Sequence, residues 1–199
     1  MVSMSSPYFP QDISNIPLDR SFFVNQPLRH VLSFYKLSDA HLLKLKRSGC
    51  KEVFIGIESG SPRILKMIRK TSDVDLVKRT IKRLFRAGIN VKGYFIFGFE
   101  GETFEDMQMS YDLAAWLKEA SMKNGTNFRT SVFQFRPYHG TKLYRDMILK
   151  GRIIDEIVHH KDLSAEIGRK QFNFTSGNFS EVSDENLREF IIKTNGINR

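Results

Sequence analysis

The stretch "VFIGIESGS", residues 53–61, joins an apolar run to a turn that holds a carboxylate, two glycines and two serines. A short apolar run bounded by such turn residues is typical of a buried strand. The chain continues into "PRILKMIRK", where Ser61 is placed as the N-cap and Pro62 as the first residue of a helix. The sequence therefore predicts a strand followed at once by a helix, with Glu58 at the carboxyl end of the strand.

The same strand–helix pattern occurs three times along the chain. Predicted strands begin near Val53, Val91 and Arg129, at intervals of about 38 residues, which suits a strand, a helix and two loops. Strands that alternate with helices favour parallel pairing through right-handed crossovers. Apolar runs such as "YFIF", residues 94–97, predict strands that are buried on both faces.

Predicted helices separate the strands and carry recognisable ends. The helix over 72–88 is amphipathic, with one apolar face formed by Val77, Ile81, Leu84 and Phe85. Other helices are predicted over 38–49 with Ser38 as cap, 103–120 with Thr103 as cap, 140–151, and Asp184 to about Lys193, and a further one starts at Pro27. Three regions result: an irregular lead-in over 1–37, the repeating part over 38–150, and an irregular cover with a terminal helix over 151–199.

Composition limits the classes of protein. With 199 residues and 41% hydrophobic residues, the chain can bury the core of about one domain. It has no apolar run long enough to cross a membrane and no secretory signal, so we expect a cytoplasmic protein. A single cysteine, Cys50, excludes an internal disulfide framework and is expected to be a small buried side chain. P-loop, zincin and α/β-hydrolase motifs are absent from the sequence.

The net charge of +9, from 31 basic and 22 acidic residues, could attract nucleic acid or an anionic cofactor. A solvated basic surface is the more common reason for such a charge, because the basic residues are scattered along helices. Both interpretations stay open at this point.

The strand ends are candidate ligand sites. Ligands of parallel α/β folds bind at the carboxyl ends of strands, where the segments 58–61, 98–103 and 136–141 are predicted to meet. Helix capping explains the hydroxyl groups of these segments but not Glu58 or Gly98. For Glu58, a functional and a structural role are equally open. Glu102 precedes a helix, where an acidic residue favours the helix dipole.

Three segments together carry a family resemblance: "LKRSGCKEVFIGIESGSPRILKMIRK", "LFRAGINVKGYFIFGFEGET" and "FQFRPYHGTKLY". In this order and spacing they resemble the radical S-adenosylmethionine (SAM) superfamily, in particular members related to cobalamin-dependent methyltransferases and methylthiotransferases. The resemblance implies an α/β fold, an incomplete (β/α)6 radical SAM barrel with parallel strands four to six and outer helices. It also implies SAM and a [4Fe–4S] cluster at the strand ends, where reductive cleavage of SAM yields a 5′-deoxyadenosyl radical.

The resemblance also implies roles for eight residues, taken motif by motif. Glu58 matches the residue that binds the ribose hydroxyls of SAM, with Ser59 assisting. Lys70 falls where a basic residue reaches the methionine carboxylate. The remaining matches concern the adenine ring of SAM. Phe97 and Gly98 match the motif that packs on this ring, and Phe135, Arg136 and Pro137 match the segment whose backbone recognises its edge.

The main departures from the family pattern are absences in the sequence. The "CxxxCxxC" loop that holds the cluster, the glycine-rich motif of strand two and a cobalamin domain are all missing. We therefore expect the C-terminal half of a barrel, with a crossover remnant before residue 38 and a partner polypeptide that supplies the N-terminal half. The expected function is that of a radical SAM enzyme fragment, inactive alone, whose intact parent performs methyl transfer or a related modification; whether that parent also uses cobalamin stays open. The alternative is a catalytically inert module that binds a partner or a nucleic acid.

Overall fold

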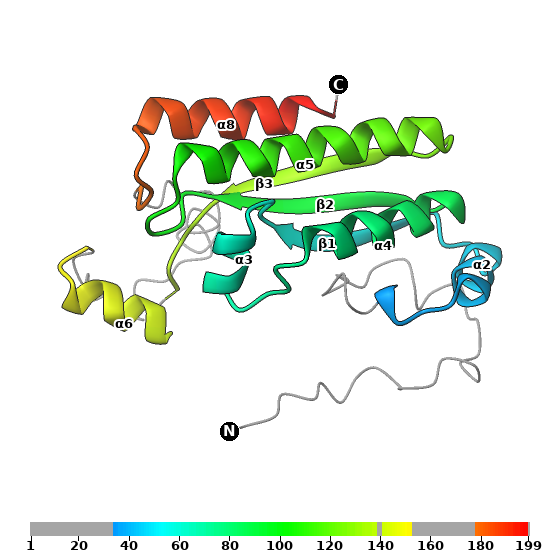
Figure 1. Ribbon diagram of the computed structural model, residues 1–199, viewed down its shortest axis with the longest axis horizontal. Coiled ribbons are helices and arrows are strands. Elements are labelled where there is room, and N and C mark those ends of the chain that lie inside the picture. Colours follow the sequence, from blue (N-terminus) through cyan, green and yellow to red (C-terminus); the bar gives the residue numbers. More distant parts are fainter. Residues whose placement is uncertain (1–33, 139–140, 153–177, 199) are drawn as a thin grey trace, which may run out of the picture.

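The computed structural model describes residues 34–138, 141–152 and 178–198. The helices and strands follow the expected order along these residues (Figure 1). They are α2 (Asp39–Arg47), β1 (Glu52–Glu58), α3 (Pro62–Met67), α4 (Val74–Arg86), β2 (Asn90–Phe97), α5 (Phe104–Lys123), β3 (Phe128–Gln134), α6 (Lys142–Leu149) and α8 (Asp184–Gly196). The helix predicted from Pro27 lies outside the described residues except at its end, where residues 34 and 35 are helical.

The three strands form one parallel sheet in the order β1-β2-β3. Val91 of β2 pairs with Val53 of β1 on one side and with Phe128 of β3 on the other. The predicted parallel α/β arrangement is therefore confirmed for these strands. Because all three strands run the same way, their carboxyl ends meet at one edge of the sheet.

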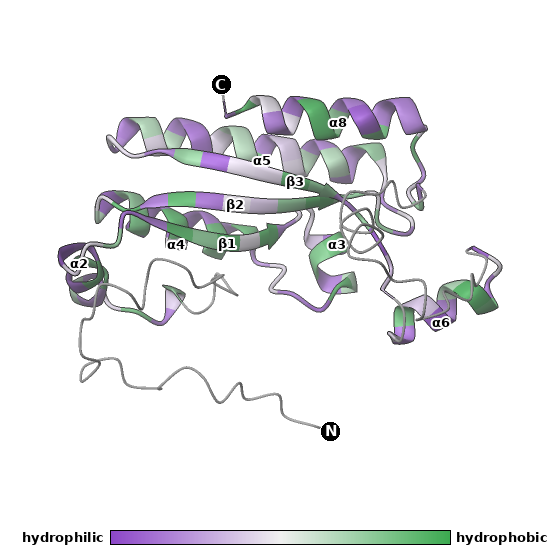
Figure 2. Cartoon of the chain, turned by 180° about the vertical axis from the view of Figure 1, so that it is seen from behind, coloured by the Kyte–Doolittle hydropathy of each residue, from purple (hydrophilic) through white to green (hydrophobic). Residues whose placement is uncertain are grey.

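One face of the sheet is covered by helices. Helices α4, α5 and α8 pack against it, and the view from the other side has the strands in front of α4 and α5, with α8 beside α5 (Figure 2). Burial alternates residue by residue along β1 and β2. The prediction that the strands are buried on both faces is wrong, because the described helices cover only one face. The opposite side, which we call the open face, is half-exposed.

The core lies between the sheet and these helices. The predicted apolar face of α4 is buried there, and the ring of Phe85 meets Phe128 of β3 edge-on at 6.4 Å. Helix α8 extends to Gly196, beyond its predicted end near Lys193. After it, the Asn198 carboxamide bonds both the N–H and the carbonyl of Thr130, so it satisfies backbone groups of β3.

Beyond the carboxyl ends of the strands, α3 and α6 flank the sheet (Figure 1). A second apolar cluster forms there, consisting of Ile64, Phe99, Phe135, Met147 and Phe179. It joins both helices to the strand ends and so builds the walls of the region where ligands are expected. Within the described ranges, no helix combines the length and apolar character that spanning a bilayer requires.

Candidate functional site

The loop after β1 is fastened to α5. Ser59 is fully buried, and its hydroxyl lies 3.0 Å from the hydroxyl of Ser110. A Cβ atom added to Gly60 would lie 2.3 Å from the Met109 carbonyl oxygen, so only glycine permits this approach of two backbones. Two residues of the motif "ESGS" are thus explained by packing and not by a ligand.

Asp106 ties the loop after β1 to the start of α5. Its carboxylate accepts hydrogen bonds from the Ser61 hydroxyl, the Arg63 guanidinium and both the backbone and side chain of Thr103. Burial alone would raise the pKa of Asp106, but these donors outweigh it and lower the pKa to about 2. Thr103 caps α5 as predicted.

Glu102 has a different role from the one its position suggested. It is fully buried, and its Oε2 accepts the backbone N–H groups of Gly98 at 2.6 Å and Phe99 at 3.1 Å. Burial raises the pKa of Glu102 to about 7, although both N–H groups act in the opposite direction. Among the described residues, its Oε1 has no hydrogen-bond partner. Glu102 therefore holds the loop after β2 from inside, instead of acting as an exposed charge near a helix end.

Glu58 ends β1 in an unusual backbone conformation. Its φ of 68° lies in the left-handed region, and the Ser59 N–H donates to the Ile57 carbonyl across it at 2.9 Å, as in a γ-turn. The pairing with β2 shifts between Gly56 and Glu58, which is a bulge-like irregularity. Bulges of this kind re-aim side chains near functional sites, and Glu58 lines the open face at the end of its strand.

The Glu58 carboxylate is paired with Lys70. The Nζ atom of Lys70 donates to Oε1 of Glu58 at 2.6 Å, and the two side chains are 21% and 16% exposed. A Cβ atom added to Gly56 would lie 2.6 Å from the same carboxylate oxygen. Gly56 therefore leaves room for the ion pair above the strand.

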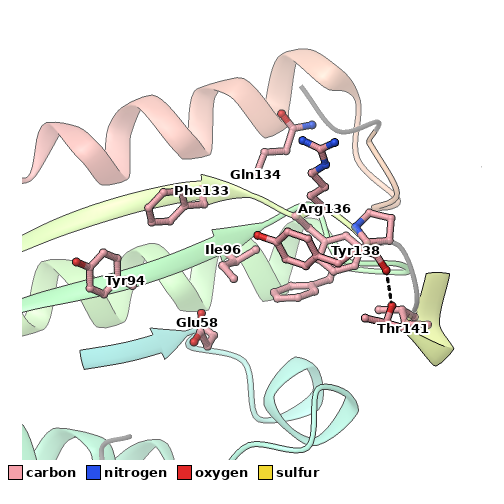
Figure 3. Close-up of a pocket in the computed structure, with 12 residues that line it drawn as sticks. Glu58, Tyr94, Ile96, Phe133, Gln134, Arg136, Tyr138 and Thr141 are labelled. Atoms are coloured by element: carbon pink, nitrogen blue, oxygen red, sulfur yellow. Dashed lines mark hydrogen bonds between the residues drawn. The ribbon is translucent and has the colours of Figure 1, made fainter. Parts of the chain in front are cut away.

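A cavity of about 620 Å³ opens over the carboxyl half of the open face (Figure 3). Glu58 lies at its edge beside Ile96 of β2, and the aromatic rings of Tyr94 and Phe133 stack at 5.9 Å on the same face. The cavity is lined by Glu58, Tyr94, Ile96, Phe99, Phe133, Gln134, Phe135, Arg136, Pro137, Tyr138, Thr141 and Leu143. Its size suits a small organic ligand, since such sites typically measure about 300–1,000 Å³.

A second hollow of about 570 Å³ adjoins the first between α3 and α6 and shares Glu58, Ile96 and Phe99 with it. Lys70 and Arg69 line its other side. The two hollows therefore form one continuous region, with the Glu58–Lys70 pair between apolar walls and a charged rim.

The structure brings five of the eight predicted site residues to these hollows: Glu58, Lys70, Phe135, Arg136 and Pro137. The other three face elsewhere. Ser59 is buried against α5, Phe97 stacks on Phe190 of α8 at 6.1 Å, and a Cβ atom added to Gly98 would face Leu187 of α8. These three residues do not line the hollows; for Phe97 the reason is that side chains along a strand alternate between its faces. Their contacts with SAM, which the resemblance implies, stay predictions.

Sequence reasoning missed the residues of β2 that do face the cavity. Tyr94 and Ile96 alternate with the buried Phe95 and Phe97. Alternation along a strand assigns Tyr94 and Ile96 to one face and Phe95 and Phe97 to the other. Because all four residues of "YFIF" are apolar, their hydrophobicity does not show which pair faces the helices. Phe99 lies in the segment 98–103 that was predicted to reach the site, but it was not assigned a role; its ring packs on Phe135 at 4.9 Å.

Iron–sulfur clusters are held mainly by several cysteine thiolates, and the residues present do not fit such a cluster. The sequence holds one cysteine, Cys50, which precedes β1 at the opposite edge of the sheet from the cavity. It is buried as expected, its thiol donates to the Glu52 carbonyl, and burial raises its pKa. The described residues contain no group of three or more side chains suited to a metal ion.

Residues 26–114 match the family model described as the Radical SAM superfamily. The chain is also similar to cytidylyl-2-hydroxyethylphosphonate methyltransferase of Streptomyces wedmorensis, with 31% identity over 131 residues, which are 62% of this chain and 23% of that protein. It is 34% identical to bacteriochlorophyllide d C-12(1)-methyltransferase of Chlorobaculum tepidum over 51% of this chain and 21% of the relative. With the ribosomal protein uS12 methylthiotransferase RimO of Escherichia coli it shares 36% identity over 43% of this chain and 18% of the relative. The matched part thus spans less than a quarter of each of these relatives.

Proposed function

We propose that this chain, whose residues 26–114 belong to the radical SAM superfamily, supplies the carboxyl-terminal strands of a (β/α)6 barrel and binds SAM on the open face of its sheet. The observation that carries the proposal is the position of Glu58. Its carboxylate stands at the carboxyl end of a parallel strand, at the edge of a cavity with apolar walls. Sites at this end of parallel sheets are where α/β proteins bind ligands.

The chemistry of the lining suits the parts of SAM. A carboxylate accepts hydrogen bonds from ribose hydroxyls, and charge-assisted bonds of this kind are stronger than neutral ones. Ile96, Phe99 and Phe135 offer apolar surface for the adenine ring. The binding role of the cavity lining is therefore to orient the nucleoside and to exclude water from around it.

The chemical step of such an enzyme requires an iron–sulfur cluster as electron donor, and these 199 residues do not fit one. We propose that the cluster ligands and the remaining barrel strands come from polypeptide outside this sequence. In the intact assembly we expect methyl transfer or a related modification, as the names of the similar methyltransferases and methylthiotransferases suggest. That the intact assembly modifies a substrate in this way, and that it carries a cobalamin cofactor, are both parts of the same proposal.

Equilibrium dialysis with labelled SAM tests the binding proposal. We expect saturable binding by the 199-residue chain, and weakening of about tenfold or more in E58A, since a charge-assisted bond is lost. Glu105 is an exposed residue in the first turn of α5, so E105A is the matched control and should bind as the wild type does. No saturable binding, or equal affinity in E58A, would contradict the proposal.

A second assay tests the expected inactivity of the chain alone. After incubation with iron, sulfide and dithionite, the chain is given SAM and 5′-deoxyadenosine is measured. We expect none above the level without protein, because several thiolates are needed to hold the cluster. Chain-dependent 5′-deoxyadenosine would refute this expectation.

The alternative of an inert nucleic-acid-binding module receives less support. Several basic side chains of α4 are engaged in ion pairs: Lys78 with Asp75, Arg79 with Asp73, and Arg83 with Asp39. Such pairing reduces the charge that α4 offers to phosphates. Binding of a nucleic acid that weakens steeply with salt, together with no SAM binding, would favour the alternative.

A further inference from the structure

The Glu58–Lys70 ion pair is associated with two residues in strained backbone conformations, Glu58 itself and Arg69. In the part of the chain that the structure describes, Glu58 at φ 68° and Arg69 at φ 58° are the only non-glycine residues with positive φ. Side chains other than glycine adopt this conformation at a cost in free energy, and such residues gather where a site needs a particular geometry. One of them carries the carboxylate of the pair, and the other directly precedes the lysine.

The end of α3 delivers Lys70 to the sheet. The Lys70 N–H donates to the Leu65 carbonyl at 2.8 Å and the Arg69 N–H to the Lys66 carbonyl at 3.1 Å. With Arg69 in the left-handed conformation, these two bonds form the Schellman arrangement that reverses a chain after a helix. The reversal turns Lys70 back toward β1, where it meets Glu58.

Gly56 provides the space in which the two side chains meet. An added Cβ atom would lie 2.6 Å from Glu58 Oε1 and 3.3 Å from Lys70 Nζ. The first distance is too short for any real contact, so a larger residue at position 56 would displace the carboxylate. Three separate features, namely the γ-turn at Glu58, the helix end at Arg69 and the missing side chain at Gly56, therefore converge on one ion pair.

We infer that Lys70 is a positioning residue for Glu58 and makes the site specific for nucleosides whose ribose hydroxyls are free. This inference rests on the proposed SAM binding and assigns Lys70 a different task from the methionine carboxylate contact that the family resemblance implies. Lys70 engages Oε1 of Glu58, and no described residue bonds to Oε2. The ammonium group keeps the carboxylate over Gly56, with Oε2 available to accept from a ribose hydroxyl.

Competition against labelled SAM distinguishes the two tasks of Lys70. Adenosine and 2′,3′-dideoxyadenosine are the competitors, because neither has a methionine carboxylate and they differ only in the ribose hydroxyls. We expect the wild type to prefer adenosine by about tenfold or more, as for a hydrogen bond to a charged group. In K70M and in G56A this preference should fall to about threefold or less, and K70R should restore most of it.

Lys66 of α3 is exposed and has no ion pair among the described residues, so K66M is the matched control and should keep the wild-type preference. Thermal unfolding of each variant, followed by circular dichroism, confirms that it is folded. If K70M loses SAM affinity but keeps the full preference for adenosine, Lys70 contacts the methionine carboxylate and the inference is overturned. If the wild type binds no SAM at all, the proposed function fails as well, and the two failures are thus told apart.

Discussion

The Oε2 atom of Glu102 lies 2.6 Å from the backbone nitrogen of Gly98, so a buried carboxylate closes the loop after β2 from within. Burial raises the pKa of this carboxyl from 4.5 to about 7. The folded state therefore binds the Glu102 proton more tightly than the unfolded state does. Between pH 4.5 and pH 7, stability must fall as the pH rises.

We expect the free energy of unfolding to decrease by up to about 3 kcal/mol from pH 4.5 to pH 8 through Glu102 alone. Urea unfolding at a series of pH values measures this change. In E102Q, which cannot ionise, the decrease should be smaller by the same amount. Parallel pH profiles for wild type and E102Q would show that the prediction is wrong.

Asp106 acts in the opposite direction and in a more acidic window. Because donors from Ser61, Arg63 and Thr103 lower its pKa from 3.8 to about 2, its contribution is complete above pH 3.8 and is lost as the pH falls through 2. D106N should destabilise the fold by about 2 kcal/mol at neutral pH and should flatten the acid limb of the stability profile. The exposed Glu105 has no such partners among the described residues, so E105Q should leave the acid limb unchanged; an unaltered acid limb in D106N would count against this role.

Replacement of Gly60 tests the close approach of the β1 loop to α5. An alanine Cβ would lie 2.3 Å from the Met109 carbonyl oxygen, which neither backbone can easily avoid. We expect G60A to lower the free energy of unfolding by about 2 kcal/mol or more, or to prevent folding. Gly196 ends α8 with open space around it, so G196A should be neutral or stabilising in the same chemical denaturation assay.

Ser110 should matter for stability and not for ligand binding. Its hydroxyl bonds to Ser59 and accepts the Gly60 N–H at 2.9 Å, inside the protein and away from the cavity. S110A leaves these buried groups with fewer partners and should cost about 1–2 kcal/mol. SAM affinity measured by dialysis should stay within about twofold of wild type; a large loss would mean that this loop belongs to the site.

The strain at Arg69 can be measured with a matched pair of variants. R69G and R69A both lose the guanidinium, but only glycine adopts positive φ without a steric penalty. R69G should therefore be more stable than R69A by about 1 kcal/mol. Equal stabilities would indicate that the helix end relaxes, and that Lys70 is not held by it.

Much of the fold was predictable because local signals and packing agree. The caps at Ser38, Ser61 and Thr103, and the apolar face of α4, lie where the sequence predicted them. Burial on both sides of the strands was wrongly predicted from "YFIF", since hydrophobicity alone does not tell which face of a strand a helix covers. For the same reason, no local pattern told that the ring of Phe97 packs on α8.

The alternation of strands and helices, the parallel direction of the strands and the place of Glu58 at a strand end were all predictable from the residues. These features depend on residue periodicity and on turn and cap residues that act locally. The partner of the Glu58 carboxylate, in contrast, is visible only in the folded chain. Lys70 comes twelve residues later in the sequence, yet it contacts Glu58. The contact requires the left-handed backbone conformation of Arg69 after α3 and the space that Gly56 leaves without a side chain. Likewise, the burial of Glu102 depends on how the loop after β2 folds over its side chain. Contacts between elements depend on backbone geometry and burial, and no local pattern in the sequence records them.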